Sequence, residues 1–262
     1  MRANPFKAMV LAFGLLGCAG ALPAETSPAA ETWADQQIDA RLEAGKRLTQ
    51  QGHPDTAIAE YLDPVIEHYE NMYKDETRRV YVAHSQQETF LYLVTAVAGD
   101  ADGKVKTKAD RAGAVAVYGY WTDALVMKAY ALSELRRPDD AKAALVRATA
   151  LSPGYPPPWI ELGFLYSSEK DWARALDAFE HAESGVEMMS DEGGKKLLKG
   201  RAWRGKAYIY TEQGKLDDSE ALYRKCLALD PDDGAAKREL AYVGQLRAQA
   251  KADAPPPATP TK

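Results

Sequence analysis

The side chains in this 262-residue chain that are best able to act in catalysis or metal binding are two cysteines, Cys18 and Cys226, and four histidines. None of the histidines forms the H-E-x-x-H pair of a zinc peptidase, and none lies near Cys226 with zinc-site spacing. The chain also has neither a glycine-rich phosphate loop nor a G-x-S-x-G turn for a nucleophilic serine. We therefore expect no catalytic residues, no metal and no cofactor, and we expect that the protein is not an enzyme. The histidines are His53, His68, His84 and His181.

Two acidic residues lie in a spacing that suggests a calcium loop. Asp100 and Asp102 come directly before Gly103. Ala98 occupies the first ligand position of such a loop, however, and Ala109 occupies the position of the closing glutamate. Because two of the main ligands are missing, we expect a solvated turn and no bound calcium.

The charge balance excludes one class of partner. The chain has 33 Lys and Arg against 38 Asp and Glu, for a formal net charge of −5. Nucleic-acid binding needs a concentrated basic face, so an acidic chain is not expected to bind DNA or RNA. The hydrophobic content of 46% and the charged content of 27% are typical of a soluble globular protein.

Residues 1–24 have the pattern of an export signal. A basic start with Arg2 and Lys7 precedes a short apolar run from Ala8 to Gly17. This run is too short for a permanent transmembrane helix, so it is typical of a signal peptide. A short buried helix is the alternative, but nothing downstream continues its pattern.

Two cleavage routes are consistent with this signal. Leu15-Leu16-Gly17-Cys18 resembles the lipobox of bacterial lipoproteins, which implies a lipid on Cys18 and an anchor facing the periplasm. An ordinary cut after Ala21 or Ala24 would instead release a soluble periplasmic protein. The linker would cover residues 25–34, of which residues 25–31 are small and polar, as expected of a tether. Either route leaves Cys226 unpaired, so we expect a buried thiol there rather than a reactive one.

A pattern of apolar residues repeats through the body of the chain. In its clearest copy, residues 156–189, the spacings place these residues on one face of each of two consecutive helices. The same positions recur 34 residues earlier and 44 residues later, so a ten-residue insertion precedes the later copy. A weaker copy covers residues 38–71, and its Pro64 should disturb the second helix. We expect the following residues to pack the repeats: Trp159, Leu162, Gly163, Tyr166, Ala175, Phe179, Ala182, Trp203, Ala207, Tyr210 and Tyr223.

The pattern resembles the tetratricopeptide repeat (TPR), a helix-turn-helix unit with fixed aromatic and small positions. The resemblance implies an all-α, right-handed helical-repeat solenoid over residues 35–250, stabilised by stacking of neighbouring units. Its units would be 38–71, 122–155, 156–189 and 200–233. A capping helix would follow at 235–250, and the proline-rich tail 251–262 should be disordered.

Two intervals do not fit the repeat. Within 72–121, the segments Thr89–Ala98 and Ala109–Tyr120 predict a degenerate helical pair. In the insertion, Met188, Met189 and the pair Gly193-Gly194 suggest an extended second helix followed by a flexible turn.

The resemblance also implies a binding groove lined by the first helix of each unit. It places Tyr130, Phe164 and Tyr208 in a column along this groove; ordinary packing between helices is the competing interpretation. Recognition of a carboxylate at a chaperone tail is not expected, because these aromatic residues replace the asparagine of the family's carboxylate clamp. The residues one turn earlier, Val126, Ile160 and Arg204, would make the column apolar at one end and cationic at the other.

These features predict an exported TPR scaffold or adaptor that binds a protein or peptide partner in the bacterial cell envelope. Contact with the membrane is expected only through the N-terminal lipid. The alternative is an envelope enzyme or small-ligand-binding protein on the same helical scaffold, which would need a deep polar pocket with convergent titratable groups.

Overall fold

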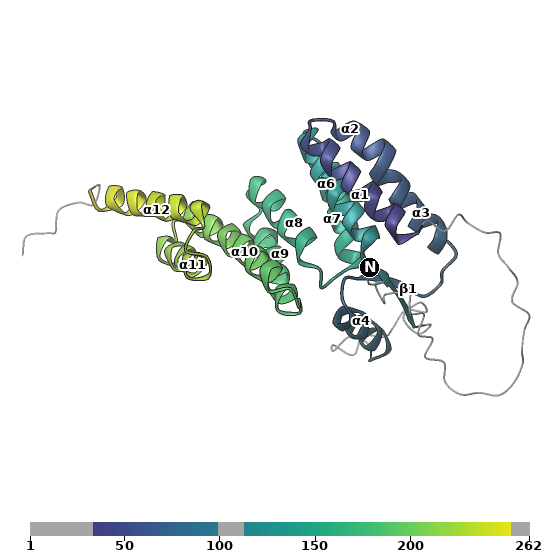
Figure 1. The fold of residues 1–262 in the computed structure, drawn as a ribbon. Coiled ribbons are helices and arrows are strands. Elements are labelled where there is room, and N and C mark those ends of the chain that lie inside the picture. Colours follow the sequence, from purple (N-terminus) through teal and green to yellow (C-terminus); the bar gives the residue numbers. More distant parts are fainter. Residues whose placement is uncertain (1–33, 99–112, 253–262) are drawn as a thin grey trace, which may run out of the picture. The chain divides into compact units, whose positions relative to one another are not determined.

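The computed structural model describes residues 34–98 and 113–252, and it divides the chain into two compact units (Figure 1). Unit 1 ends at Pro158 and unit 2 begins at Trp159. The predicted signal peptide with Cys18, the turn at Asp100 and residues 253–262 of the predicted tail lie outside the described residues, whereas residues 251 and 252 end a helix instead of being disordered. Within the described residues, no helix is long and apolar enough to cross a membrane.

Unit 1 contains two helical hairpins that pack on each other, as the copies at 38–71 and 122–155 predict. Helices α1 and α3 of the first hairpin both contact α6 of the second. The rings of Tyr69 and Tyr73 stack on Trp121 at centroid distances of 5.7 Å and 6.2 Å. The first hairpin consists of α1 (Asp35–Gln50), α2 (Pro54–Ala57), the π-helical turn η1 (Ile58–Leu62) and α3 (Asp63–Tyr73), and the second of α6 (Tyr120–Glu134) and α7 (Pro138–Leu151).

The disturbance expected at Pro64 is the π-helical turn η1. Proline has no backbone N–H, and its ring collides with the carbonyl four residues earlier. The backbone widens just before Pro64, so that the N–H of Asp63 donates to the carbonyl of Ile58, five residues back. The Glu60 carbonyl accepts a hydrogen bond from the Arg41 guanidinium at 3.4 Å. The proline therefore changes the hydrogen-bond pattern of the helix locally but does not end the helix.

The described residues between 79 and 118 form a β-α-β insert, and the second helix of the pair predicted in this interval is wrong. Strand β1 (Arg79–Ala83) pairs in parallel with β2 (Ala114–Tyr118), and α4 (Gln86–Ala98) lies between them in the chain. Helix α4 covers the apolar segment Thr89–Ala98 as expected, but Ala114–Tyr118 is a strand. Its sequence A-V-A-V-Y alternates small and β-branched residues, which suits a strand whose alternate residues are buried. The two repeat hairpins contact each other directly through α1, α3 and α6.

Unit 2 contains two helical hairpins and ends in a single helix, as predicted. Val243 of α12 is buried against Tyr223 and Cys226 of α11, so α12 caps this stack. The ten-residue insertion lengthens the first helix of the last hairpin: Asp191 caps α10, and Gly193 and Gly194 lie in its first turn rather than in a flexible loop. The elements are α8 (Pro156–Ser168, which begins just before the unit boundary), α9 (Trp172–Glu187), α10 (Glu192–Glu212), α11 (Leu216–Leu229) and α12 (Gly234–Ala252).

All four hairpins use the same turn, which is strong evidence that the weak copy at 38–71 is a repeat. One residue in each turn adopts a left-handed backbone with φ between 57° and 83°. The next residue donates its N–H to the carbonyl five positions back, at 2.8–2.9 Å. A serine or threonine in each first helix donates to the carbonyl four residues earlier, at 2.7–3.0 Å. The left-handed residues are Gly52, Arg136, Lys170 and Gly214, and the hydroxyl residues are Thr49, Ser133, Ser167 and Thr211.

Glycines determine how closely the helices of unit 2 approach one another. Phe179 of α9 is fully buried between α8 and α10. A Cβ atom added at Gly163 would lie 2.6 Å from its ring, and one at Gly205 would lie 2.1 Å from it. The small residues of the repeat therefore make room for this one ring, which is the packing role that the sequence predicts for Gly163 and Phe179.

Candidate functional site

The three aromatic residues predicted to line a groove are exposed. Each lies on the first helix of its hairpin, and each follows a small residue that is buried at the helix contact. Tyr130 is 52% exposed, Phe164 38% and Tyr208 41%. Tyr130 belongs to unit 1, and the other two belong to unit 2. Each unit therefore presents aromatic surface on a first helix.

Phe164 combines exposure with packing. Its ring meets Phe179 edge to face at a centroid distance of 5.2 Å. The Arg201 guanidinium lies 5.7 Å from its centroid and pairs with Glu161 at 2.6 Å. Removal of this ring would therefore disturb the core of unit 2 as well as its surface, whereas no such ring contact is recorded for Tyr130 or Tyr208 in the described part of the chain.

The flanking positions differ from the prediction in two respects. Ile160 is fully buried in the core with Phe179, so it cannot line a surface groove. Arg204 forms an ion pair with Asp233, whose side chain is only 8% exposed. The predicted cationic end of the aromatic column is therefore neutralised within unit 2. Val126 is half-buried on α6.

The predicted packing residues lie in or against the cores of unit 2. Phe179, the alanines and Tyr223 are buried, and the remaining aromatic positions are half-buried. Trp159 stacks on His181 at 4.3 Å, and Arg174 lies 4.8 Å from the Tyr166 ring. Cys226 is buried, and burial raises the pKa of its thiol to about 11. At neutral pH it is therefore a small packing group, since the reactive thiolate is absent.

A charged cluster in unit 1 was missed by sequence reasoning. His84 follows the end of β1, and its Nε2 lies 3.2 Å from Oδ1 of Asp123 in the first turn of α6. Its backbone N–H donates to Glu88 in the first turn of α4 at 2.9 Å, and Glu88 is buried. Tyr155 stacks on the His84 ring at 3.5 Å and donates its hydroxyl to Asp123 at 2.8 Å. Gly119 is needed beside this ring, since a Cβ there would lie 2.4 Å from it.

The electrostatics of this cluster favour a histidine that is charged at neutral pH. Burial alone would lower the pKa of His84. Hydrogen bonds and attraction from Asp123 and Glu88 outweigh that effect and raise the pKa to about 9. Both carboxylates lie in first turns of helices, where the helix dipole favours negative charge. These groups face one another, so the cluster ties β1, α4, α6 and the segment after α7 together.

The sequence offers only a faint signal for this cluster. His84 and Glu88 are four residues apart, whereas Asp123 and Tyr155 are 39 and 71 residues from His84. No motif joins these positions, and the β-α-β insert that brings them together was expected to be helical. Among the described residues, no group of histidine, cysteine or acidic side chains is arranged to hold a metal ion.

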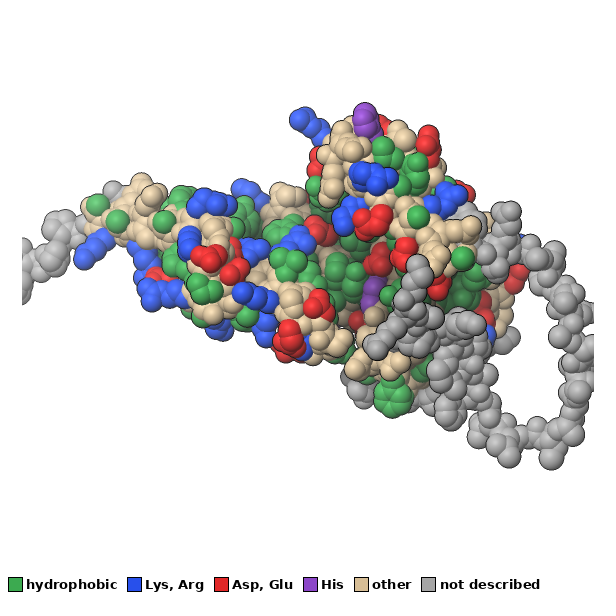
Figure 2. Space-filling model, in the orientation of Figure 1, with side chains coloured by type: hydrophobic (Ala, Val, Ile, Leu, Met, Phe, Trp, Pro, Cys, Tyr) green, Lys and Arg blue, Asp and Glu red, His purple; other side chains and the backbone are tan. Residues whose placement is uncertain are grey.

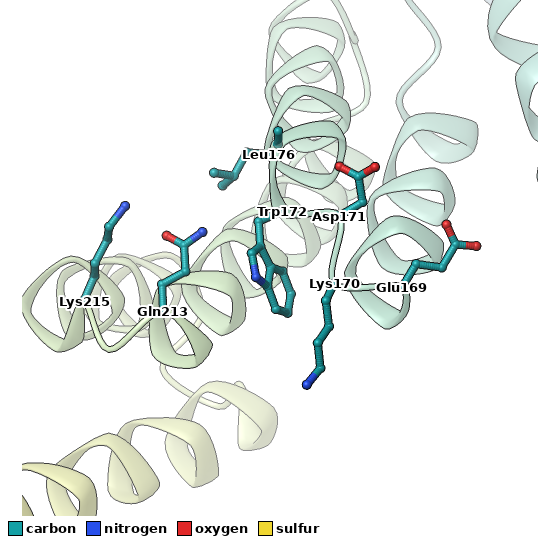
Figure 3. A pocket seen from close by; sticks show the side chains of 8 residues that line it. Glu169, Lys170, Asp171, Trp172, Leu176, Gln213 and Lys215 are labelled. Atoms are coloured by element: carbon teal, nitrogen blue, oxygen red, sulfur yellow. The ribbon is translucent and has the colours of Figure 1, made fainter.

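One open pocket of about 700 Å³ lies in unit 2 beside two hairpin turns. The indole ring of Trp172 and the side chain of Leu176 provide the apolar surface of this pocket (Figure 3). The side chains of Lys170, Lys215 and Glu169 extend in different directions instead of converging.

Comparison with known families matches two of the predicted repeats. Tetratricopeptide-repeat family models match residues 122–155 and 200–233. Comparison with curated proteins gives no significant match. Repeats of this family commonly bind protein partners, so the matches indicate a scaffold for protein–protein interaction.

Proposed function

We propose that this protein, which carries tetratricopeptide repeats at residues 122–155 and 200–233, is an exported scaffold that binds partner proteins in the bacterial cell envelope. It acts by binding and not by catalysis. The observation that carries the proposal is the exposure of an aromatic ring on the first helix of three hairpins, Tyr130, Phe164 and Tyr208.

Physical reasoning supports a binding role for these rings. Large apolar side chains are expensive to leave in water, and burial of a full ring contributes roughly 1.5–3 kcal/mol. Aromatic rings also lose little conformational entropy on binding, so a few of them dominate many protein interfaces. Figure 2 shows basic and acidic side chains interspersed with hydrophobic ones over the helices of unit 2. The aromatic rings are therefore better candidates than any single charged side chain for the residues that provide binding affinity.

The proposed export rests on the first 34 residues. The basic start, the short apolar run and Cys18 support a lipoprotein signal, and residues 25–34 would tether the folded units to the lipid. Cys18→Ala should abolish lipid labelling and move the protein to the soluble periplasmic fraction. An intact mass that begins at Leu22 or Glu25, without a modified N-terminus, would exclude the anchor.

The binding role is tested by a photo-crosslinking amino acid placed at position 130, 164 or 208 in the native envelope. A control position is Phe90, which is 71% exposed on α4 outside the repeats. We expect a discrete crosslinked protein from the three repeat positions and none from position 90.

The crosslinked partner then allows affinity to be measured. Tyr130→Ala and Tyr208→Ala should each cost about 1–3 kcal/mol of binding free energy. Leu197→Ala, an exposed apolar change on the same helix as Tyr208, is the control and should leave affinity unchanged. Phe164→Ala should lower both affinity and melting temperature, because its ring also packs on Phe179. Unchanged binding in all three aromatic variants would remove these rings as the recognition site.

A further inference from the structure

The outer face of α4, in the insert of unit 1, is exposed and apolar. Phe90, Leu91 and Val94 are 71%, 40% and 45% exposed. They share one face of the helix, because residues three and four apart are neighbours on a helix surface. We call these three residues the α4 face. In the rest of the described part of unit 1, the large exposed apolar side chains are single residues on separate elements: Met72, Tyr118, Tyr130 and Val146.

The α4 face carries no charge. Glu88 is the single charged residue among the thirteen residues of α4. It is 3% exposed and accepts a hydrogen bond from the backbone N–H of His84, on the inner side of the helix. Tyr92 and Ala96, four and eight residues after Glu88, are buried on that same inner side against the sheet. Burial of the α4 face in an apolar environment would therefore leave no charged group unpaired.

The chain enters unit 1 at the end of the insert where α4 begins. Asp39, just past the first turn of α1, accepts a hydrogen bond from the Tyr120 hydroxyl at 3.2 Å. The ring of Tyr120 meets that of Tyr118, the last residue of β2, at a centroid distance of 4.8 Å. His84, which follows β1 and lies two residues before α4, is in contact with Gly119, which follows β2. The starts of α1 and α4 therefore lie at the same end of the sheet.

The proposed lipid anchor would hold this end of unit 1 near a bilayer. Sixteen residues, 19–34, separate Cys18 from the first residue of α1. A chain of this length spans at most about 58 Å when fully extended. The start of α1 therefore stays within that distance of the anchored residue, and the α4 face belongs to the same end of unit 1.

We infer that the α4 face lies on the surface of the lipid bilayer that holds the anchor. This inference rests on the proposed lipid-anchored scaffold and adds a membrane contact beyond the lipid itself. A specific protein partner usually requires polar groups around an apolar centre, whereas a bilayer needs only apolar surface on an otherwise polar protein. Helix α4 has no basic residue, so the contact does not depend on anionic lipids. It would give unit 1 a defined orientation on the membrane.

The test uses the chain from Cys18 to Lys262, coupled through the Cys18 thiol to a maleimide phospholipid in phosphatidylcholine vesicles. Cys226 is buried, so it does not compete for the maleimide. A photoreactive benzophenone amino acid replaces Phe90 or, as the control, Val146, which is 48% exposed on α7 of the same unit. The vesicles contain a radiolabelled phosphatidylcholine. After irradiation, position 90 should incorporate at least about fivefold more lipid label than position 146.

A charge placed on the α4 face should prevent the contact. In the chain with the photoreactive group at position 90, Val94→Asp adds a carboxylate one turn further along the helix and should reduce lipid labelling at least about fivefold. Val146→Asp adds the same charge elsewhere in unit 1 and should change the labelling by less than about twofold. Both positions are exposed, so the circular dichroism spectrum should stay unchanged in both variants.

Several outcomes would overturn the inference. Equal labelling at positions 90 and 146 would show that the α4 face does not lie on the bilayer. Equal losses from the two aspartate variants would show that labelling follows the charge of the whole protein. A covalent dimer formed through position 90 in place of a lipid adduct would show that a second copy of the chain covers the α4 face.

The outcomes also distinguish this inference from the proposed function. If a protein crosslinks at the repeat positions and Cys18 carries a lipid in the native protein, but position 90 labels no lipid, the anchored scaffold stands and the α4 contact is wrong. If position 90 labels lipid but no protein crosslinks at any repeat position, the membrane contact stands and the scaffold is wrong. An unmodified native N-terminus would overturn the anchor, and the inference with it.

Discussion

The two compact units combine the same repeat with different means of stabilisation. In unit 2, the core is apolar, and glycines allow α8 and α10 to close on the buried ring of Phe179. In unit 1, the repeat hairpins also hold a β-α-β insert, and the insert is joined to them by ionised groups around His84. The comparison teaches that the stacked repeats of unit 2 are centred on close apolar packing, whereas the insert of unit 1 is joined to its repeats by a buried cluster of charged groups.

The polar contacts of the insert are clearest in the segment after α7. Ser152 donates its hydroxyl to the carbonyl of Val82 in β1. The Gly154 N–H donates to the Tyr92 hydroxyl on α4 at 2.8 Å. Tyr155 stacks on His84 directly before α8 begins. The insert therefore holds the last residues of unit 1 through backbone and side-chain contacts that a plain repeat would lack.

The largest effect should come from the apolar core of unit 2. Phe179→Ala removes a fully buried ring between two glycines and should cost about 3–5 kcal/mol of unfolding free energy. The closely packed helices cannot collapse fully into the space that the ring leaves. Hydrogen exchange should show the loss of protection in α8 to α11, with the helices of unit 1 unaffected.

The same chemical change at an exposed site provides the control. Phe90→Ala on α4 should change the unfolding free energy by less than about 0.5 kcal/mol. Equal losses from the two variants would show that Phe179 is not the centre of the unit 2 core.

Sequence reasoning was most successful where the structure is periodic. Family models match the repeats at 122–155 and 200–233, and the structure has helical hairpins at 38–71 and 156–189 as well, because helical packing repeats the same residue types at the same spacing. The β-α-β insert could not be found in this way. Its second strand is only five residues long, and a short apolar run does not distinguish a strand from a buried helix.

The candidate sites were predicted less completely than the fold. The positions of Tyr130, Phe164 and Tyr208 came from the repeat pattern, but the burial of Ile160 and the pairing of Arg204 depend on neighbouring helices. The His84 cluster joins residues that are distant in the chain, and no spacing rule predicts such contacts. Tertiary partners therefore decide which residues near a repeat position remain free to bind.

The second-largest loss of stability should come from the charged cluster that joins the insert to the repeats of unit 1. His84→Gln removes the cation between Asp123 and Glu88, and the loss of one partner from a buried charge cluster should cost about 3 kcal/mol. The folded pKa of His84, about 9, lies above its ordinary value of 6.5. Its stabilisation is therefore fully present below pH 6.5 and is lost as the pH rises through 9. Denaturant titrations between pH 6 and 10 should show this decline in the wild type.

The variant itself isolates the role of the histidine. The difference in unfolding free energy between wild type and His84→Gln should shrink steadily from pH 6.5 to pH 9 and above. His53→Gln, at an exposed position in the same unit, should follow the wild-type curve. A difference that stays constant across this range would contradict a charged His84.

The smallest effect should appear at the shared turn, where the two units are most alike. Gly52 and Gly214 adopt the left-handed backbone without a side chain, whereas Arg136 and Lys170 adopt it with one. Gly52→Ala in unit 1 and Gly214→Ala in unit 2 should each cost about 1 kcal/mol, because a Cβ atom is unfavourable in this conformation. Arg136→Gly and Lys170→Gly relieve the same strain but increase the freedom of the unfolded chain, so each should gain at most about 0.5 kcal/mol. Chemical denaturation of the four variants would measure these changes, and similar values in both units would confirm that the turn is one structural element. A loss above about 2 kcal/mol confined to Gly52→Ala would instead show that the first hairpin differs from the other repeats, since the strain of a single left-handed residue is smaller than that.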